Sequence, residues 1–142
     1  MIMSLSSKTT AGIIQQTMTF VGVTPQDVYE ALMDSKKHAA FTGGEASISK
    51  RVGGKFTTFD GWATGVTVEL IPNKRIVQTW RADDWPPQVF STCTYELLAV
   101  GNGAQLNFIQ VNVPKLFVKT VSQGWLKYYW KPMVKYFAKQ AK

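Results

Sequence analysis

The feature that most constrains the fold is an amphipathic helical pattern near the C-terminus, over residues 121–139. At about 100° per residue, one continuous arc of this helix is apolar and largely aromatic. The arc consists of Trp125, Leu126, Tyr129, Trp130, Met133, Tyr136 and Phe137. So broad an aromatic face needs a broad concave partner, and a curved antiparallel sheet is the partner that the rest of the chain offers. Pro132 lies inside the pattern and predicts a kink or a split near Tyr128, because proline removes a backbone donor.

The N-terminal part predicts one strand followed by two short helices. Residues 13–20 alternate in the manner of a strand. Thr24 is placed to cap a helix that begins at Pro25, with Asp27 in its first turn, and this helix ends near residues 34–35. Residues 35–41 favour a second short helix, because two glycines after Thr42 stop it.

Residues 45–113 predict strands that are joined by tight turns. The turn signals are Asp60-Gly61, Pro72-Asn73-Lys74 and Gly101-Asn102-Gly103. Strands chained in this way form an antiparallel meander. The expected fold class is therefore α+β, with a curved antiparallel sheet wrapped around the long C-terminal helix. We expect residues 1–12 to be a flexible segment and residues 13–142 to form a single domain.

Positive charge is concentrated in the same C-terminal segment. The net charge of the 142-residue chain is +7. Residues 1–114 are balanced, whereas residues 115–142 contain seven lysines and no acidic residue. Four of them recur every four residues and form one stripe outside the apolar arc: Lys127, Lys131, Lys135 and Lys139. A field of one sign favours an acidic partner, and the alternative is a solvated helix face.

No set of residues with catalytic spacing stands out. His38 is expected at the surface or as a helix cap, and Cys93 as a buried, inert thiol in a strand. Asp83-Asp84 indicates a turn. The sequence therefore predicts a binding module rather than an enzyme, with no cofactor and no metal site.

Composition excludes several other classes of protein. A lone cysteine excludes an intramolecular disulfide, and no apolar run approaches the length of a membrane span. The N-terminus lacks a secretory signal, so we expect a cytoplasmic protein with no membrane partner. The stripe could contact nucleic acid only non-specifically, because the nearby aromatic residues lie on the buried arc.

A cavity between helix and sheet is a second candidate site. Its expected lining is Trp80, Tyr95, Phe108, Trp125, Tyr129 and Met133. Aromatic residues in this number can also fill the space themselves as ordinary core. A small apolar ligand remains the alternative to a protein partner.

Several short motifs together resemble a known family. They are residues 28–32 (VYEAL), 53–56 (GGKF), Asp60-Gly61 with Gly65, 68–81 (VELIPNKRIVQTWR), Asp84-Trp85-Pro86, Gly124-Trp125 and Tyr128-Tyr129. Over roughly residues 13–138 the chain resembles the activator of heat-shock-protein-90 ATPase homologue family, within the START-like helix-grip superfamily. The likeness is greatest to the C-terminal domain of the family's two-domain co-chaperones.

The resemblance implies a co-chaperone-like module that binds heat-shock protein 90 and modulates its ATPase. The alternative is a carrier or cyclase-like protein that holds a small apolar ligand. The two-domain co-chaperones have an additional N-terminal docking domain, which we do not expect within these 142 residues. We therefore expect weak stimulation of ATP turnover by this domain alone.

Overall fold

The structure is a computed structural model that describes residues 3–10 and 12–140. Its strands are β1 (Met3–Thr10), β2 (Ile13–Val21), β3 (Ser47–Ile48), β4 (Lys55–Thr58), β5 (Ala63–Ile71), β6 (Arg75–Ala82), β7 (Ser91–Val100) and β8 (Gly103–Val111). Its helices are α1 (Pro25–Met33), α2 (Ser35–Thr42), η1 (Lys115–Phe117), α3 (Val118–Trp125), η2 (Leu126–Trp130) and α4 (Lys131–Gln140). The last four form one long helical segment.

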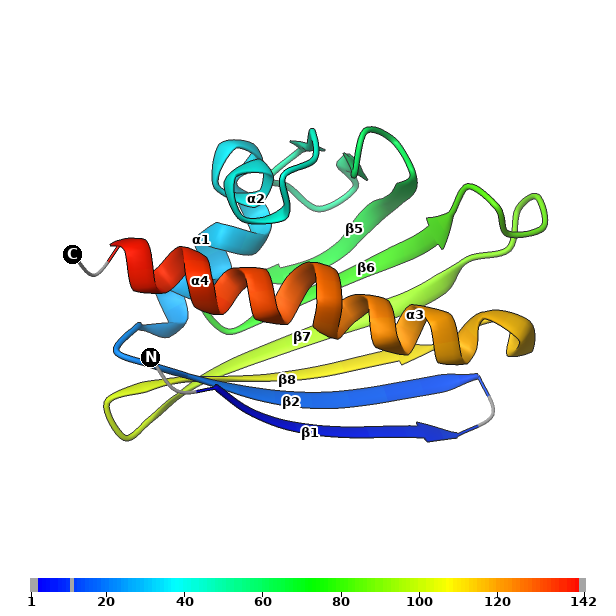
Figure 1. The fold of residues 1–142 in the computed structure, drawn as a ribbon. Coiled ribbons are helices and arrows are strands. Elements are labelled where there is room, and N and C mark those ends of the chain that lie inside the picture. The colour runs from blue at the N-terminus through cyan, green and yellow to red at the C-terminus, as the bar shows by residue number, and fades with distance from the viewer. Residues whose placement is uncertain (1–2, 11, 141–142) are drawn as a thin grey trace.

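All eight strands belong to a single antiparallel sheet with the order β1-β2-β8-β7-β6-β5-β4-β3. The long C-terminal helix lies across one face of this curved sheet, and α1 and α2 cover one end of it (Figure 1). This is the helix-grip α+β fold that the sequence predicts. The Asp60-Gly61 turn joins β4 to β5, and a side chain at Gly65 would collide with the carbonyl oxygen of Thr79 on β6.

The first strand is a difference from the prediction. Residues 1–12 were expected to be flexible, but β1 pairs with β2 from Met3–Phe20 to Thr10–Ile13. A strand at the edge of a sheet is held by backbone hydrogen bonds, so it does not need the apolar alternation that marks a buried strand. The polar sequence MSLSSKTT carries little of that signal.

The two short helices begin and end where the sequence predicts. Thr24 and Asp27 form a reciprocal capping box at the start of α1, and Pro25 occupies the first turn. Asp34 accepts a hydrogen bond from the backbone of Lys37 and so caps α2. Gly43 ends α2 with a φ of 81°, a conformation that glycine adopts without strain.

Pro132 changes the helix without breaking it. Residues Leu126–Trp130 form a π-helical turn, in which the backbone of Lys131 donates to Leu126. The chain thus takes up one extra residue in front of the proline, whose nitrogen has no hydrogen to donate. The split predicted near Tyr128 does not occur: a π turn lies there instead, and the helix continues to Gln140.

Two buried glutamine side chains on the sheet accept hydrogen bonds from tryptophans of the long helix. Trp125 Nε1 donates to Gln110 Oε1 over 2.7 Å, and Trp130 Nε1 donates to Gln16 Oε1 over 2.6 Å. Gln110 and Gln16 are themselves buried, on β8 and β2. A buried polar group is costly unless it is paired, so these two bonds favour one position of the helix along the sheet.

Candidate functional site

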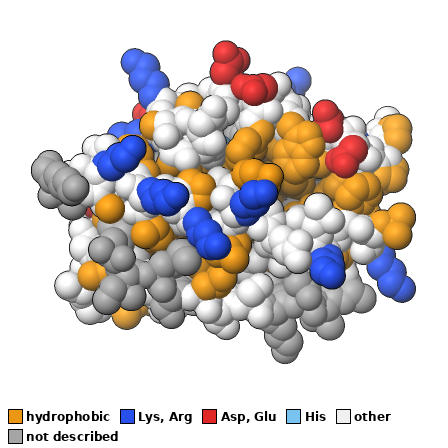
Figure 2. Space-filling view, viewed as in Figure 1, with side chains coloured by type: hydrophobic (Ala, Val, Ile, Leu, Met, Phe, Trp, Pro, Cys, Tyr) orange, Lys and Arg blue, Asp and Glu red, His pale blue; other side chains and the backbone are white. Residues whose placement is uncertain are grey.

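The lysine stripe, defined as Lys127, Lys131, Lys135 and Lys139, is exposed along its whole length. Between these lysines, Tyr129, Met133 and Phe137 are buried against the sheet, as the helical pattern predicts. Figure 2 shows basic side chains in a row along the exposed surface of the long helix, whose basic residues are all lysines. The stripe is therefore available to a partner without any change in the core.

A shallow groove of about 390 Å³ runs between α2 and α4, along the stripe. It is lined by Ala40, Phe41, Pro132, Tyr136 and the four lysines. Within the part of the chain that the structure describes, every ion pair uses Lys37, Lys50 or Arg75. The stripe thus carries positive charge that these ion pairs do not neutralise.

Beside the stripe lies an apolar opening of about 140 Å³ between the helix and the sheet, which we call the aromatic cleft. It is lined by Phe59, Trp62, Trp80, Asp84, Trp85, Phe117, Thr120, Val121, Gly124, Trp125, Tyr128 and Tyr129. Trp62 and Tyr128 are 40% and 50% exposed, and both rings contact Phe59 edge to face. Hydrophobic side chains gather beside the row of lysines in Figure 2.

The predicted cavity residues do not form one site. Trp80 and Tyr129 line both the aromatic cleft and a second, more enclosed space of about 10 Å³, whereas Trp125 lines only the cleft and Tyr95 only the second space. Phe108 and Met133 are buried core residues and line neither space. A space of about 10 Å³ is at the lower limit for a single water molecule, so this second space has no room for a larger ligand.

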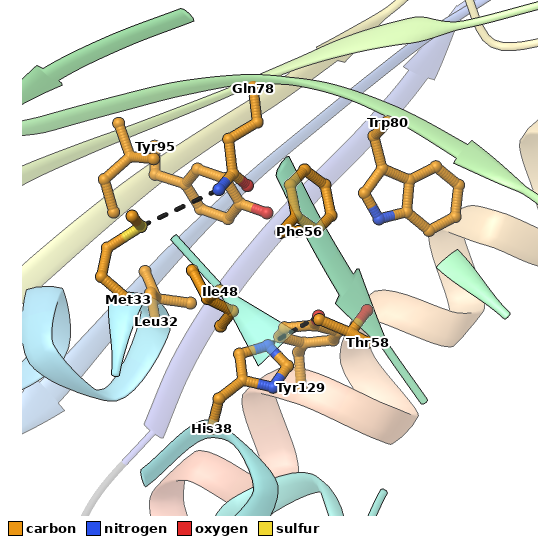
Figure 3. Close-up of a pocket in the computed structure, with 11 residues that line it drawn as sticks. Leu32, Met33, His38, Ile48, Phe56, Thr58, Gln78, Trp80, Tyr95 and Tyr129 are labelled. Carbon is orange, nitrogen blue, oxygen red and sulfur yellow. Dashed lines mark hydrogen bonds between the residues drawn. The ribbon is translucent and has the colours of Figure 1, made fainter. Parts of the chain in front are cut away.

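His38 corrects a prediction, because it is buried in that enclosed space rather than at the surface. Its Nε2 shares a 2.9 Å hydrogen bond with the hydroxyl of Tyr129, and Figure 3 shows the two side chains meeting from α2 and η2. Burial lowers the pKa of His38 to about 4, so the ring is neutral near pH 7. His38 and Phe41 lie three residues apart, so one face of α2 turns both inward.

The same space contains other polar groups. His38 Nδ1, Thr58 Oγ1 and Trp80 Nε1 are buried without a hydrogen-bond partner among the described residues. Gln78 Nε2 contacts Met33 Sδ at 3.8 Å, and Figure 3 shows Thr58 beside Tyr129.

Two further predictions about individual residues are confirmed. Cys93 is fully buried, and burial raises the pKa of its thiol well above the usual value. Asp83 and Asp84 lie in the turn after β6.

Within residues 3–10 and 12–140, no group of three or more His, Cys, Asp or Glu side chains is placed to hold a metal ion. None of the described helices combines the length and the hydropathy needed to cross a membrane.

Sequence reasoning missed the rim of the aromatic cleft. Phe59 and Trp62 flank the Asp60-Gly61 turn, and Tyr128 contacts Phe59 from the long helix. An aromatic residue on each side of a tight turn was the available signal. The helical periodicity places Tyr128 outside the apolar arc, so the sequence pattern assigned no role to this half-exposed tyrosine.

The sheet, the gripped helix and the space between them define a helix-grip protein. The family model described as "Activator of Hsp90 ATPase homolog 1-like protein" matches residues 22–138. The chain belongs to this family, which confirms the resemblance seen in its motifs.

Several similar proteins are named as activators of the 90 kDa heat shock protein ATPase or as their homologs. The activator of 90 kDa heat shock protein ATPase homolog of Dictyostelium discoideum is 31% identical over 71% of this chain and 27% of its own length. Homolog 1 of Homo sapiens is 30% identical over 74% of this chain and 31% of its own length. The chain thus spans about three tenths of these relatives. The crystal structure of an HSP90 activator from Plasmodium falciparum superposes on this chain with a TM-score of 0.76, at 26% sequence identity. The superposition covers 82% of this chain and 89% of the Plasmodium chain.

Proposed function

We propose that this domain binds heat-shock protein 90 and modulates its ATP turnover, and that the lysine stripe is the surface that meets the chaperone. Family membership supports the choice of partner, since curated relatives are named as activators of this ATPase. The observation that supports the surface is the row of four exposed lysines on one helix face.

Electrostatic reasoning gives the stripe a specific role. Charges at the rim of an interface mainly accelerate association and make it dependent on salt. At about 0.15 M ionic strength, the field of an exposed charge reaches only about 8 Å, so the lysines act on an acidic surface that lies close to the stripe. Binding should therefore weaken steeply as salt rises.

The test is titration calorimetry against purified heat-shock protein 90 at two salt concentrations. We expect the stripe variant, in which Lys127, Lys131, Lys135 and Lys139 are changed to Gln, to bind more weakly than wild type at low salt. The matched control changes Lys36, Arg51, Lys55 and Lys74 to Gln, which removes four exposed charges elsewhere. Its affinity should stay near that of the wild type.

Two outcomes would refute the proposal. Equal affinities for the stripe and control variants would remove the role of the stripe. No detectable binding by the wild type, with nucleotide present, would remove the chaperone as partner. An ATPase assay on the same mixtures measures whether binding changes turnover, and we expect weak stimulation by this domain alone.

A further inference from the structure

The volume of the aromatic cleft decides what can occupy it. Sites for drug-sized ligands measure about 300–1,000 Å³. The cleft measures about 140 Å³. An apolar cavity of about 150 Å³ holds a molecule the size of benzene. One aromatic side chain therefore fits the cleft, whereas a sterol or a fatty acid does not.

The lining of the cleft resembles an anchor pocket in a protein interface. Trp62 and Tyr128 expose 40% and 50% of their surface at its rim, and Trp80 and Trp85 are buried deeper. Large aromatic residues around a small pocket are typical of the few positions that contribute most of the binding energy at an interface. The indole nitrogens of Trp80 and Trp85 are also buried without an acceptor among the described residues.

The cleft and the lysine stripe are continuous. The Lys127 ammonium lies 5.2 Å from the ring centroid of Tyr128, so the first lysine of the stripe stands at the rim of the cleft. Asp84 also lines the cleft. A partner carboxylate is repelled by Asp84 and attracted by the stripe, which fixes the direction in which an acidic segment continues from its anchor.

The spacing of the stripe selects a conformation for that segment. Four helical residues advance roughly 6 Å, at about 1.5 Å each. Two residues of an extended chain advance about 6.6 Å. Acidic residues at alternate positions of an extended segment therefore meet successive lysines from Lys127 to Lys139. The intervening side chains point away from the helix or into the groove beside Phe41 and Tyr136.

We propose that the aromatic cleft takes one aromatic side chain of an extended, acidic partner segment, whose alternate carboxylates then follow the lysine stripe. This inference rests on the proposed function, because it treats the stripe as the partner surface. It adds the anchor, the conformation and the acidic pattern of the segment.

The test uses a synthetic peptide in which one tryptophan is followed by alternating serine and glutamate, with four glutamates in total. Binding is followed by titration and by NMR of the five tryptophan indole signals of the protein. We expect the signals of Trp62, Trp80 and Trp85 to shift. Replacing the peptide's tryptophan by alanine should weaken binding about tenfold or more, as loss of a central anchor does. Replacing its glutamates by glutamine should remove the dependence on salt.

Gly124 allows the cleft to be filled from within. It lines the cleft, and a Cβ added there would meet only the Tyr128 ring, at 3.8 Å. Gly124→Leu should weaken the tryptophan peptide about tenfold and leave the alanine peptide unchanged. The matched control is Gln123→Leu, at an exposed neighbouring position outside the cleft. If Gly124→Leu does not fold, Trp62→Ser tests the rim at a half-exposed position.

Three results would overturn the inference: no binding of the tryptophan peptide, equal binding of the tryptophan and alanine peptides, or unchanged binding by the folded Gly124→Leu or Trp62→Ser variant. Tighter binding of an RNA oligonucleotide or of phosphatidylserine vesicles would also overturn it, since the stripe would then select phosphate. The test of this inference uses a peptide and not the chaperone. If the protein binds the peptide but not heat-shock protein 90, the proposed function is refuted and the inference about the cleft stands.

Discussion

Trp125 is the single side chain on which the gripped helix depends most. It is 3% exposed, its ring contacts Phe108 and Tyr129 at 4.5 Å between centroids, and its indole nitrogen donates to Gln110. Trp125→Ala should lower the free energy of unfolding by about 3–5 kcal/mol, as large aromatic truncations in a core do. Urea denaturation measures this loss directly.

A surface substitution on the same helix provides the control. Lys135 is exposed, so Lys135→Ala should change the free energy of unfolding by less than about 0.5 kcal/mol. If Trp125→Ala unfolded at the same urea concentration as wild type, the helix would not be packed on the sheet as described.

His38 makes stability depend on pH. Its pKa is about 4 in the folded protein, against a usual value of 6.5, because burial disfavours the charged ring. As pH falls below 6.5 the unfolded chain takes up a proton first, and stability is lost until the folded protein also protonates near pH 4. The shift predicts a loss of roughly 1.5 kcal/mol between pH 6.5 and pH 5. Urea denaturation across this interval measures it.

Two variants separate burial from hydrogen bonding at His38. His38→Gln should flatten the profile between pH 6.5 and 5, because it removes the titrating ring. Tyr129→Phe removes the hydrogen bond but keeps the ring buried, so the dependence on pH should remain. A wild-type protein with equal stability at both pH values would show that His38 is not buried as a neutral ring. Glu30 and Asp34 have a lowered pKa, so both stay ionised in the folded protein across this interval.

Among the elements, the long helix contains a glycine that its packing does not require. A Cβ at Gly124 would make one ordinary contact, with Tyr128. Gly124→Ala should therefore raise the free energy of unfolding by about 0.5–1 kcal/mol, the difference in helix propensity. Gly43→Ala should instead lower it by about 1–2 kcal/mol, because Gly43 ends α2 at a φ of 81°. Equal effects of the two substitutions in thermal or urea unfolding would contradict the assigned helix boundaries.

The elements that the sequence predicts are those with a strong local signal. Capping at Thr24, the Asp60-Gly61 turn and the arc of the last helix all depend on residues close together in the chain. Strand β1 escaped prediction because an edge strand needs only backbone pairing. A kink or split was predicted near Tyr128 and a π turn is found there, since the core on both sides of Pro132 decides whether a helix breaks or absorbs an extra residue.

Prediction of the site was uneven for the same reason. The lysine stripe follows from a four-residue repeat, and its exposure is confirmed. The burial of His38 was missed because its hydrogen-bond partner, Tyr129, is 91 residues away. The aromatic cleft combines the turn after β4 with the long helix, so the aromatic residues that flank this turn could mark only one side of it.

At the scale of the whole molecule, the two faces of the long helix have different environments. Its inner face is buried on the sheet, whereas its outer face carries the stripe and borders the aromatic cleft (Figures 1 and 2). The two proposed contacts differ in range, because charge acts over about 8 Å at physiological salt while an aromatic ring must be seated in its pocket to contribute. They should therefore affect different rate constants of the same encounter.

Binding kinetics with immobilised heat-shock protein 90 can separate the two contacts. The stripe variant should associate more slowly and lose the salt dependence of its association rate, with little change in dissociation. Gly124→Leu should dissociate about tenfold faster and keep an association rate within about twofold of wild type, since short-range contacts mainly set residence time. Gln123→Leu should match wild type in both rates. A stripe variant that changed only dissociation, or a Gly124→Leu protein that changed only association, would show that the two surfaces do not divide the encounter in this way.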